Sequence, residues 1–592
     1  MQYMNKIRTE QMLYLVIFLL ALGIRMLNLG EAALSDFEAG WALQSLGLAA
    51  GEKVNLGPQP GYIFATTIFF SLQGASNFLA RFWPALAGSL IVLAPYAFRD
   101  RLGQKAAIIM AVGLSLDPGL VALSRLAGGP MPAIAFTILA LALFYREQPA
   151  LGGIMAGLAL LSGPAVLIGL LGLGIALGIA NLLGLWRWDD GQPDERNPET
   201  PDPSARLDWR TALLFGGGTI LLIGTLFSFY PQGLGAWAAS VSTFFQGWAQ
   251  TSSIPAGRLI FTIIFYAVFA LIIGLAAGVR GWLQGNKIAQ FLSIWFLVGL
   301  LIPLLYPARQ VGDIAWALLP LWALAGLELS RSASRQQNWL ISLGQAAAVL
   351  VLMIVIWLTL AGLDAAIPET VQNYWFVVGA AALIGILVYV MVYLGWGWQT
   401  ARTGMIWGLA AGFGAYMIAS TFGVSQVRPS SALEFWRPAP TTRPTDLFSE
   451  TLRDLALSQT GHADFLEVVS LVDEPSMRWV LRDIEGLTFV SSLGEEENPM
   501  VIITRDGDPI GARQAYYRGQ DFGWWESPGW GGSIPWEPMR WIIDRKGAVI
   551  TEKVVLWARV DLFPAEPETV EEPLLEPETD HSEPSSDEGV EP

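Results

Sequence analysis

The chain has 592 residues, of which 53% are hydrophobic and 15% charged, with a mean hydropathy of +0.46. Soluble domains carry about 25% charged residues, so these values exclude an ordinary soluble enzyme. With no cysteine and two histidines, the chain cannot form disulfide scaffolds, thiol centres or Cys/His zinc sites. The last 29 residues hold 11 acidic residues and no lysine or arginine, so they carry −11 of the net charge of −16. The rest of the chain has a net charge of −5, which excludes a nucleic-acid binder.

A helix that crosses a membrane needs about 20 mostly apolar residues. Thirteen apolar runs fit that length, at 11–29, 82–98, 105–122, 131–145, 150–165, 167–185, 211–229, 259–279, 288–306, 313–329, 338–362, 373–395 and 403–422. Lysine and arginine concentrate in every second connecting segment, which predicts a cytoplasmic N-terminus. We therefore expect an all-α polytopic domain over residues 1–422, lying in the plasma membrane.

The first loop, residues 30–81, is expected on the extracytoplasmic side. Its apolar stretch 61–72 is too short to span and predicts an interfacial helix. Asp36 and Glu38 stand at the start of the loop, and two carboxylates this close can divide a proton-accepting role from a metal- or hydrogen-bonding role. The alternative is a capped interfacial helix, with Ser35 or Asp36 as the N-cap and Glu38 in the first turn.

After the last span the composition changes. Residues 423–444 are rich in Pro, Ser, Thr and Arg and predict a linker, whereas 445–563 predict a small extracytoplasmic α/β domain. Its expected elements are a helix over LFSETLRDLAL and strands over FLEVVSLV, LTFVSS, MVIITR and EKVVLWARVDLF. Residues 564–592 are acidic and Pro-rich and predict a disordered tail.

Four motifs follow one another in the first part of the chain. They are the acidic pair Asp36/Glu38, the apolar helix GYIFATTIFFSLQG, and Ser76–Ala85 with Arg81, followed by Ser124-Arg125 in the next outer loop. In order and spacing they resemble the C-type polytopic glycosyltransferases, which include protein O-mannosyltransferases and aminoarabinose transferases of lipid A. The resemblance covers about the first 150 residues and, more loosely, the remaining spans.

The chain departs from that family at two positions. Phe37 occupies the position at which the family has an aspartate before the glutamate, so the proton acceptor is either Asp36 in a shifted register or Glu38 alone. Pro130 stands about five positions after Arg125, where many members have an acidic residue.

The resemblance implies an enzyme that transfers a sugar from a polyprenyl-phosphate donor to a glycan, lipid or protein acceptor outside the cytoplasm. A hydroxyl acceptor needs a carboxylate to take its proton, and the departing phosphate needs fixed positive charge. Arginine suits that second role because its planar fork binds two phosphate oxygens. The candidates are Arg309, Arg125, Arg81 and Arg258, all at expected outer span boundaries. Arg309 is the strongest of them, although an anchoring pair with Asp313 is the alternative.

A Gly/Pro-rich loop with many aromatic residues is expected at 514–541. Its side chains could bind a glycan or rest on the membrane, or could form the core of the small domain. The candidates are Trp524, Trp525, Trp530 and Trp536. The metal requirement is unknown; carboxylates near a phosphate could hold a divalent cation without histidine.

Two other classes of function compete with the transferase. A lipid or glycan transporter is disfavoured because no pair of Gly/Pro-broken helices with buried ionisable residues is evident in matching halves of the sequence. A non-catalytic glycan- or lipid-binding scaffold is favoured by Pro130 and the separated carboxylates. A catalytic site is expected to place Asp36 and Glu38 at a cavity with Arg309 across it, whereas carboxylates that face solvent at a helix start would favour the scaffold.

Overall fold

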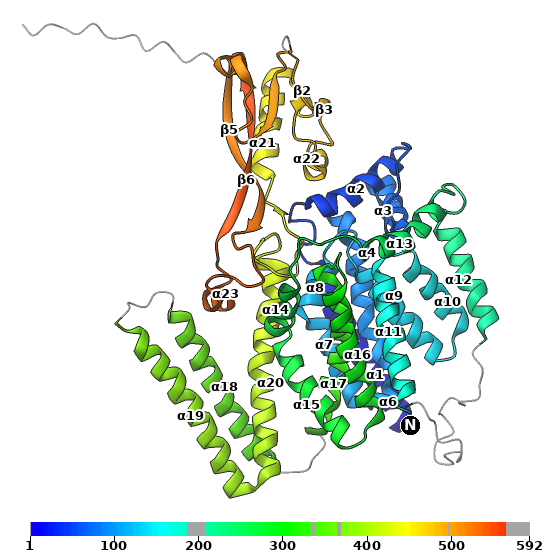
Figure 1. The fold of residues 1–592 in the computed structure, drawn as a ribbon, viewed down its shortest axis with the longest axis vertical. Helices are drawn as coiled ribbons and strands as arrows, with labels where there is room; N and C mark the ends of the chain where they lie inside the picture. Colours follow the sequence, from blue (N-terminus) through cyan, green and yellow to red (C-terminus); the bar gives the residue numbers. More distant parts are fainter. Residues whose placement is uncertain (1, 186–207, 333–337, 364–368, 495–496, 564–592) are drawn as a thin grey trace, which may run out of the picture.

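The computed structural model describes residues 2–185, 208–332, 338–363, 369–494 and 497–563. A helical bundle (residues 2–422) forms one body, and a sheet domain (445–563) stands on one end of it, joined by the linker 423–444 (Figure 1). The N-terminus lies at the opposite end of the bundle, as the predicted orientation requires. Which end faces the cytoplasm stays a prediction, and the acidic tail 564–592 lies outside the described residues.

The bundle is built from helices that follow the apolar runs of the sequence. The first half contains α1 Gln2–Met26, α2 Asp36–Ala49, α3 Pro60–Gln73, α4 Asn77–Leu90, α5 Ala94–Ala97, α6 Arg99–Leu102, α7 Gln104–Leu116, α8 Pro118–Ser124, α9 Met131–Tyr145, α10 Pro149–Leu160 and α11 Ala165–Leu182. The second half contains α12 Trp209–Ile223, α13 Gly233–Gln246, α14 Ala256–Tyr266, α15 Val268–Leu283, α16 Lys287–Leu305, α17 Ala315–Ser332, α18 Trp339–Gly362, α19 Val371–Trp396 and α20 Trp398–Phe422.

The chain is a multi-pass membrane protein. Eight helices of the described part are long and apolar enough to cross a bilayer, or ten if two bent pairs each count as one span. The other three predicted spans coincide with the shorter apolar helices α9, α10 and α12. The all-α membrane architecture is therefore confirmed, whereas the number thirteen stays a prediction.

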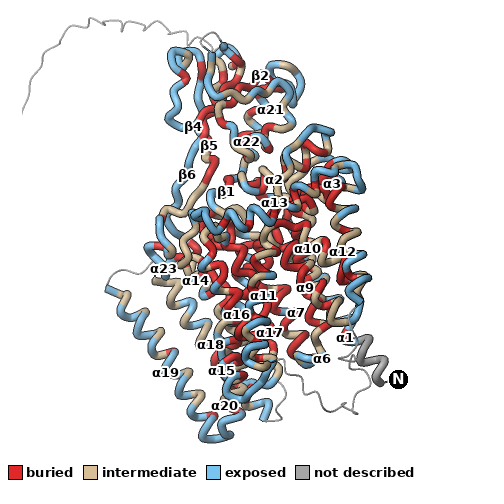
Figure 2. Tube along the Cα trace, turned by 45° about the vertical axis from the view of Figure 1, so that its right-hand side comes forward, coloured by how far each residue is buried: buried red, intermediate tan, exposed pale blue. Residues whose placement is uncertain are grey.

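Burial differs sharply between the centre and the edge of the bundle. In the span that contains α17, 94% of the apolar window is buried, against 11% in α19 (Figure 2). Helix α19 exposes large apolar side chains such as Phe376, Leu387 and Met391. An apolar surface of this extent needs lipid around it, so α18 and α19 are edge helices of the membrane domain.

Two of the predicted spans are broken by a sharp bend. The axis bends by 54° between α7 and α8 and by 91° between α14 and α15. At the first break, Asp117 caps α8 by accepting from the Gly119 and Leu120 amides and also accepts from Trp322 Nε1 at 2.9 Å. Arg25 donates to the freed carbonyls of Leu114 and Ser115. The buried charges thus replace the helix hydrogen bonds that the bend removes.

The sheet domain contains a six-stranded mixed sheet in the order β1-β5-β6-β4-β2-β3. Its elements are β1 Thr441–Thr442, α21 Asp446–Thr460, β2 Phe465–Ser470, α22 Pro475–Val480, β3 Glu485–Phe489, β4 Val501–Arg505, β5 Tyr517–Pro528, α23 Pro538–Asp544 and β6 Val549–Arg559. Strand β2 pairs in parallel with β3 and β4, whereas β6 pairs antiparallel with β4 and β5. The four predicted strands and the predicted helix are present, and β5 occupies part of the segment predicted as a loop.

The sheet domain docks on the bundle at two places. Helix α22 packs against α2, and Trp479 enters an apolar cluster with Tyr62 and Phe70. Helix α23 inserts Trp541, which is fully buried, against Phe435 of the linker at a ring distance of 4.2 Å. The linker is itself buried over residues 432–437 and is therefore part of the interface between the two bodies.

A glycine substitution tests the packing around the first helix break. A Cβ added to Gly113 would lie 2.1 Å from the Trp322 ring, whereas a Cβ on Gly217 would meet nothing within 4 Å. We expect Gly113→Ala to lower the free energy of unfolding by about 1–3 kcal/mol, because overpacking displaces Trp322. Thermal unfolding of the purified protein in detergent measures the effect, with Gly217→Ala as the matched control. Equal melting temperatures for the two variants would contradict the packing described for this contact.

Candidate functional site

The first loop begins with a capped helix. Ser35 is the N-cap of α2: its hydroxyl accepts from the Glu38 amide, and Glu38 Oε2 accepts from the Ser35 amide at 3.2 Å. This reciprocal arrangement is a capping box, which fixes the entry of the chain into the helix. The alternative interpretation of the acidic motif, with Ser35 as cap and Glu38 in the first turn, therefore describes the local geometry.

Glu38 also forms a buried ion pair with Arg81 of α4. The Arg81 Nε and Nη2 atoms lie 2.7 and 2.9 Å from the two oxygens of Glu38, and each residue is only 1% exposed. The Ala127 amide donates to Glu38 Oε1 at 3.2 Å, from the segment after α8. Arg81 uses its remaining N–H groups on the carbonyls of Leu29, Ala32 and Ala33. The pair thus joins the first loop to α4 and to the segment before α9.

The environment of Glu38 keeps it ionised. Burial alone would raise the pKa of this carboxyl group, but the charge and hydrogen bonds of Arg81, the charge of Arg437 and the Ala127 amide together lower its pKa below the usual value. An efficient general base has a pKa near the working pH. Glu38 is consequently a strong anchor and a weak proton acceptor.

Asp36 points to a different partner. Its Oδ1 accepts from the Ser476 amide at 2.9 Å, and its Oδ2 accepts from Trp525 Nε1 at 2.7 Å. Close by, Trp479 Nε1 donates to Asn77 Oδ1 at 2.8 Å. The two predicted catalytic carboxylates therefore diverge: Glu38 faces α4, and Asp36 binds the sheet domain.

Three of the four predicted phosphate-binding arginines donate hydrogen bonds to backbone carbonyl groups. Arg81 is engaged as described above. Arg125 donates to the carbonyls of Ile24, Arg25, Leu27 and Asn28, where α1 ends, and Arg258 donates to the carbonyls of Phe435 and Arg437 in the linker. Their donors stabilise turns that have lost helix or sheet partners.

Within the described part of the chain, Arg309 makes one long hydrogen bond, from Nη1 to the Ile254 carbonyl at 3.4 Å. Asp313 accepts from the Gln310 amide in a second capping box, and among the described residues no ion pair joins it to Arg309. Arg309 lines neither of the two hollows described below. Its predicted role at the phosphate, across a cavity from the carboxylates, stays a prediction.

Arg437, which was not among the predicted site residues, lies beside Glu38. Glu38 faces a small cavity of about 10 Å³ between the first loop and the linker, called here the Arg437 cavity. Its polar lining consists of Ser35, Glu38, Ser430, Arg437, Thr441 and Thr442. The only signal in the sequence was a set of three arginines, Arg428, Arg437 and Arg443, in a linker otherwise rich in Pro, Ser and Thr.

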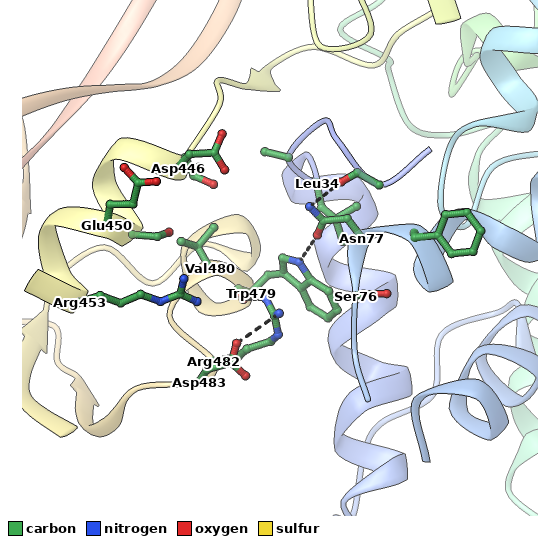
Figure 3. Close-up of a pocket in the computed structure, with 15 residues that line it drawn as sticks. Leu34, Ser76, Asn77, Asp446, Glu450, Arg453, Trp479, Val480, Arg482 and Asp483 are labelled. Atoms are coloured by element: carbon green, nitrogen blue, oxygen red, sulfur yellow. Dashed lines mark hydrogen bonds and ion pairs between the residues drawn. The ribbon is translucent and has the colours of Figure 1, made fainter. Parts of the chain in front are cut away.

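A larger polar cleft of about 400 Å³ opens on the other side of the same loop (Figure 3). Ala33 lines both hollows, so they adjoin. Charged side chains reach the cleft from α21 and from the segment after α22, opposite Asn77 of the first loop (Figure 3). The charged residues are Asp446, Glu450, Arg453, Arg482 and Asp483.

The aromatic segment divides into buried and exposed parts. Trp524, Trp525 and Trp530 are 1%, 3% and 7% exposed, and the first two lie in strand β5. Their ring faces are covered, so the alternative of an aromatic core of the small domain describes Trp524 and Trp525, whereas Trp530 packs against Phe435 of the linker. Trp536 is 75% exposed, and its role in binding a glycan or the membrane stays a prediction.

Within the described residues, no group of three or more acidic or histidine side chains is arranged to hold a metal ion. A divalent cation at this site therefore stays a prediction from the sequence.

Known proteins resemble the chain in sequence over one segment and in fold over almost its full length. A sequence model of the dolichyl-phosphate-mannose-protein mannosyltransferase family matches residues 47–183. The crystal structure of ArnT from Cupriavidus metallidurans bound to undecaprenyl phosphate matches with a TM-score of 0.52 and 15% identity, covering 93% of this chain and 99% of that one. The predicted resemblance to the C-type polytopic glycosyltransferases is confirmed.

The apo state of the same ArnT gives a TM-score of 0.52 at 14% identity, covering 96% of this chain and all of that one. At this identity the likeness concerns the fold. The matched segment of the family model begins at residue 47 and so leaves out Asp36 and Glu38. No curated protein matches the chain.

A double-mutant cycle tests the buried ion pair. We expect Glu38→Gln or Arg81→Gln to cost about 3–5 kcal/mol, because each leaves an uncompensated buried partner, and the double variant to cost less than the sum. Exposed Glu52→Gln in the same loop is the control. Additive losses would contradict the pairing.

The pH dependence of the same pair has a fixed sign. Folding lowers the pKa of Glu38 below its unfolded-state value of about 4.3. The contribution of the ionised carboxylate to the free energy of unfolding is therefore complete above that value, and it is lost as the pH falls through the pKa of Glu38 in the folded protein. We therefore expect the stability gap between wild type and Glu38→Gln to narrow in acid. A gap that widened below about pH 4 would show that Glu38 is not held ionised.

Cross-linking tests the role of Asp36 in docking. A Cβ on Gly40 would lie 4.0 Å from the Pro475 Cβ, which suits a disulfide, and the chain has no native cysteine. We expect the Gly40→Cys/Pro475→Cys variant to form a disulfide under oxidation. Adding Asp36→Asn should slow this reaction, because both carboxylate oxygens of Asp36 accept a hydrogen bond, whereas the side-chain amide of asparagine can accept only through its oxygen. Exposed Glu31→Gln is the matched control. An unchanged rate in Asp36→Asn would contradict the docking role.

Proposed function

We propose that this chain is a membrane glycosyltransferase that takes a sugar from a polyprenyl-phosphate donor and passes it to an acceptor. The supporting observation is the fold match, over nearly the full length of both chains, to a structure that holds undecaprenyl phosphate. The family model over residues 47–183 adds independent support from sequence. We place the reaction outside the cytoplasm, at the end of the bundle that carries the sheet domain.

The reaction breaks the bond between the sugar and the lipid phosphate and forms a bond from the sugar to an acceptor oxygen. The acceptor proton passes to a carboxylate, and the phosphate leaves with the electron pair. Asp36 is the better proton acceptor, because each of its oxygens accepts one hydrogen bond and it is partly exposed. Glu38 receives donors from Arg81, Ala127 and Ser35, and we assign it a positioning role.

The polar cleft is our candidate for the acceptor path. It is open, adjoins the loop that carries Asp36, and offers both acidic and basic side chains to hydroxyl groups. Nothing in its lining selects between a glycan, a lipid and a protein, so the proposal specifies only a polar acceptor with a free hydroxyl.

A second candidate is a non-catalytic scaffold of the same fold. It is favoured by one observation: both carboxylates are engaged within the protein, Glu38 with Arg81 and Asp36 with the sheet domain. Such a protein would bind polyprenyl phosphate or its sugar conjugate without turning it over.

A donor-panel assay separates the two functions. The purified full-length protein is given radiolabelled sugars on polyprenyl phosphate, and both transfer and donor hydrolysis are counted. We expect turnover by wild type, with a loss of about 10²–10⁴-fold in Asp36→Asn. The Asp36→Asn change is made in the cross-linked Gly40→Cys/Pro475→Cys background, so that loss of docking does not imitate loss of a base.

Glu52→Gln is the activity control, since this residue is exposed and outside both hollows. Full activity of cross-linked Asp36→Asn would remove Asp36 from the chemistry. Binding of polyprenyl phosphate with no turnover of any donor would establish the scaffold instead.

A further inference from the structure

The segment 529–545, which follows strand β5 and contains α23, is fixed to the end of the bundle that carries the sheet domain. Trp541 is fully buried, and its ring packs on Phe265 of α14 at a centroid distance of 5.6 Å. Arg545 donates to the hydroxyl of Tyr416 in α20 at 2.9 Å. Contacts with α14 and α20 therefore determine where this part of the sheet domain lies relative to the membrane helices.

Helix α14 gives the direction of the segment. It is bent by 91° from α15, which packs along the apolar spans α16 and α17. Since α15 follows the spans, α14 runs along the plane of the membrane. A Cβ on Gly257, at the start of α14, would meet the side chain of Ser533, and Phe265 near the end of α14 contacts Trp541. Residues 533–541 thus follow α14 along the membrane surface.

The contact with α20 gives the depth of the segment. A hydrocarbon core about 30 Å thick takes about 20 residues of helix. Counted from Arg402, near the opposite end of α20, that length reaches Phe422, and Tyr416 lies within it. Beyond Tyr416, α20 still exposes the apolar side chains of Ile418 and Phe422. Lipid therefore extends past the level at which Arg545 binds α20.

Helix α18 reaches the same level. Trp357, near the end of this helix, contacts the Tyr416 ring at a centroid distance of 5.4 Å, and its neighbour Leu358 is exposed. Helix α23 itself contacts α18. Figure 1 shows α23 at about the height of the upper ends of α18 and α19, below the top of the bundle at α2 and α3. Edge helices of the membrane domain thus surround the level of α23.

Three large apolar side chains are exposed at this level. Ile534, Trp536 and Met539 are 38%, 75% and 40% exposed. Between them, the exposed side chains of Glu537 and Arg540 form an ion pair at 3.2 Å. Apolar and charged groups side by side suit the boundary between acyl chains and headgroups, where tryptophan is enriched and long charged side chains reach water.

We propose that the sheet domain inserts Ile534, Trp536 and Met539 into the adjoining leaflet of the membrane. The three side chains then continue the lipid-facing surface of α18 and α20, which explains why so much apolar surface is left uncovered by protein. Two aliphatic side chains beside the indole favour lipid over a sugar, which needs hydrogen-bonding groups as well as an aromatic face. The inference does not depend on the proposed transfer reaction.

Insertion would also hold the sheet domain in place. Ile534, Trp536 and Met539 lie at membrane depth because Trp541 and Arg545 dock the segment on α14 and α20. Burial of the three side chains in lipid therefore favours the docked arrangement, by linkage between lipid contact and docking. The domain is then held at two places, by Asp36 at the first loop and by lipid at α23.

Site-specific labelling tests the contact, because the chain has no native cysteine. Full-length Ile534→Cys, Trp536→Cys and Met539→Cys carry an environment-sensitive nitrobenzoxadiazole group in phosphatidylcholine nanodiscs, with or without a nitroxide quencher on the acyl chains. We expect blue-shifted emission and quenching close to that of Phe422→Cys. Tyr516→Cys is the matched control and should stay unquenched, because Tyr516 is also an exposed aromatic residue but lies at the far end of β5.

The absence of quenching at all three positions, with Phe422→Cys quenched, would overturn the proposal. An emission shift at Trp536→Cys that required a soluble oligosaccharide, with no quenching by lipid, would overturn it too and assign Trp536 to glycan binding. Melting curves report the folding of each variant. The three positions are independent tests, so a variant that fails to fold leaves the others to decide.

Disulfide formation tests the role of lipid in docking. In nanodiscs, Ile534→Ser/Trp536→Ser in the Gly40→Cys/Pro475→Cys background should form the disulfide severalfold more slowly than the background alone. Tyr516→Ser is the matched control and should leave the rate unchanged. An equal rate in the Ile534→Ser/Trp536→Ser variant would show that lipid does not hold the domain and would overturn that part of the proposal.

Discussion

The buried pair between Glu38 and Arg81 is the interaction on which the arrangement of this site depends. It brings the first loop, the start of α4 and the segment after α8 to one point. Because Arg81 also holds the carbonyls before α2, the pair determines where that helix begins and hence where Asp36 meets the sheet domain. A buried ion pair of this kind adds little net stability, since the cost of removing both charges from water offsets much of their attraction. Its main effect is to favour one geometry over others.

The positions of the membrane helices could be predicted because apolar length alone selects a helix in lipid. The breaks within these helices could not be predicted. The apolar run continues through Asp117–Pro118 and through Ala267, and the capping partners Arg25 and Trp322 are distant in sequence. In the sheet domain, strand β5 was not predicted, because the glycines Gly519 and Gly523 within it are more typical of a loop than of a strand. Their small size instead admits Trp557 and Arg443 beside the strand, and a register shift follows Gly523.

For the site, sequence identified Glu38 and Arg81 separately and assigned them to different tasks. Their pairing is a contact across 43 residues, and local spacing carries no information about it. Asp36 was recognised as a special carboxylate, but its partners in α22 and β5 belong to another body of the molecule. Arg437 was overlooked because a Pro- and Ser-rich segment usually predicts exposed chain, whereas residues 432–437 here are buried by α14 and α23.

The bond between Asp36 and Trp525 joins residues 489 positions apart. A ribosome adds about 5–20 residues per second, so the first loop exists for roughly 25–100 seconds before its partner strand is made. During that interval Asp36 lacks its indole partner, and the linker has not yet closed the Arg437 cavity. The site is therefore completed only when biosynthesis of the chain is nearly finished, and a truncated translation product would insert its helices while lacking the finished site.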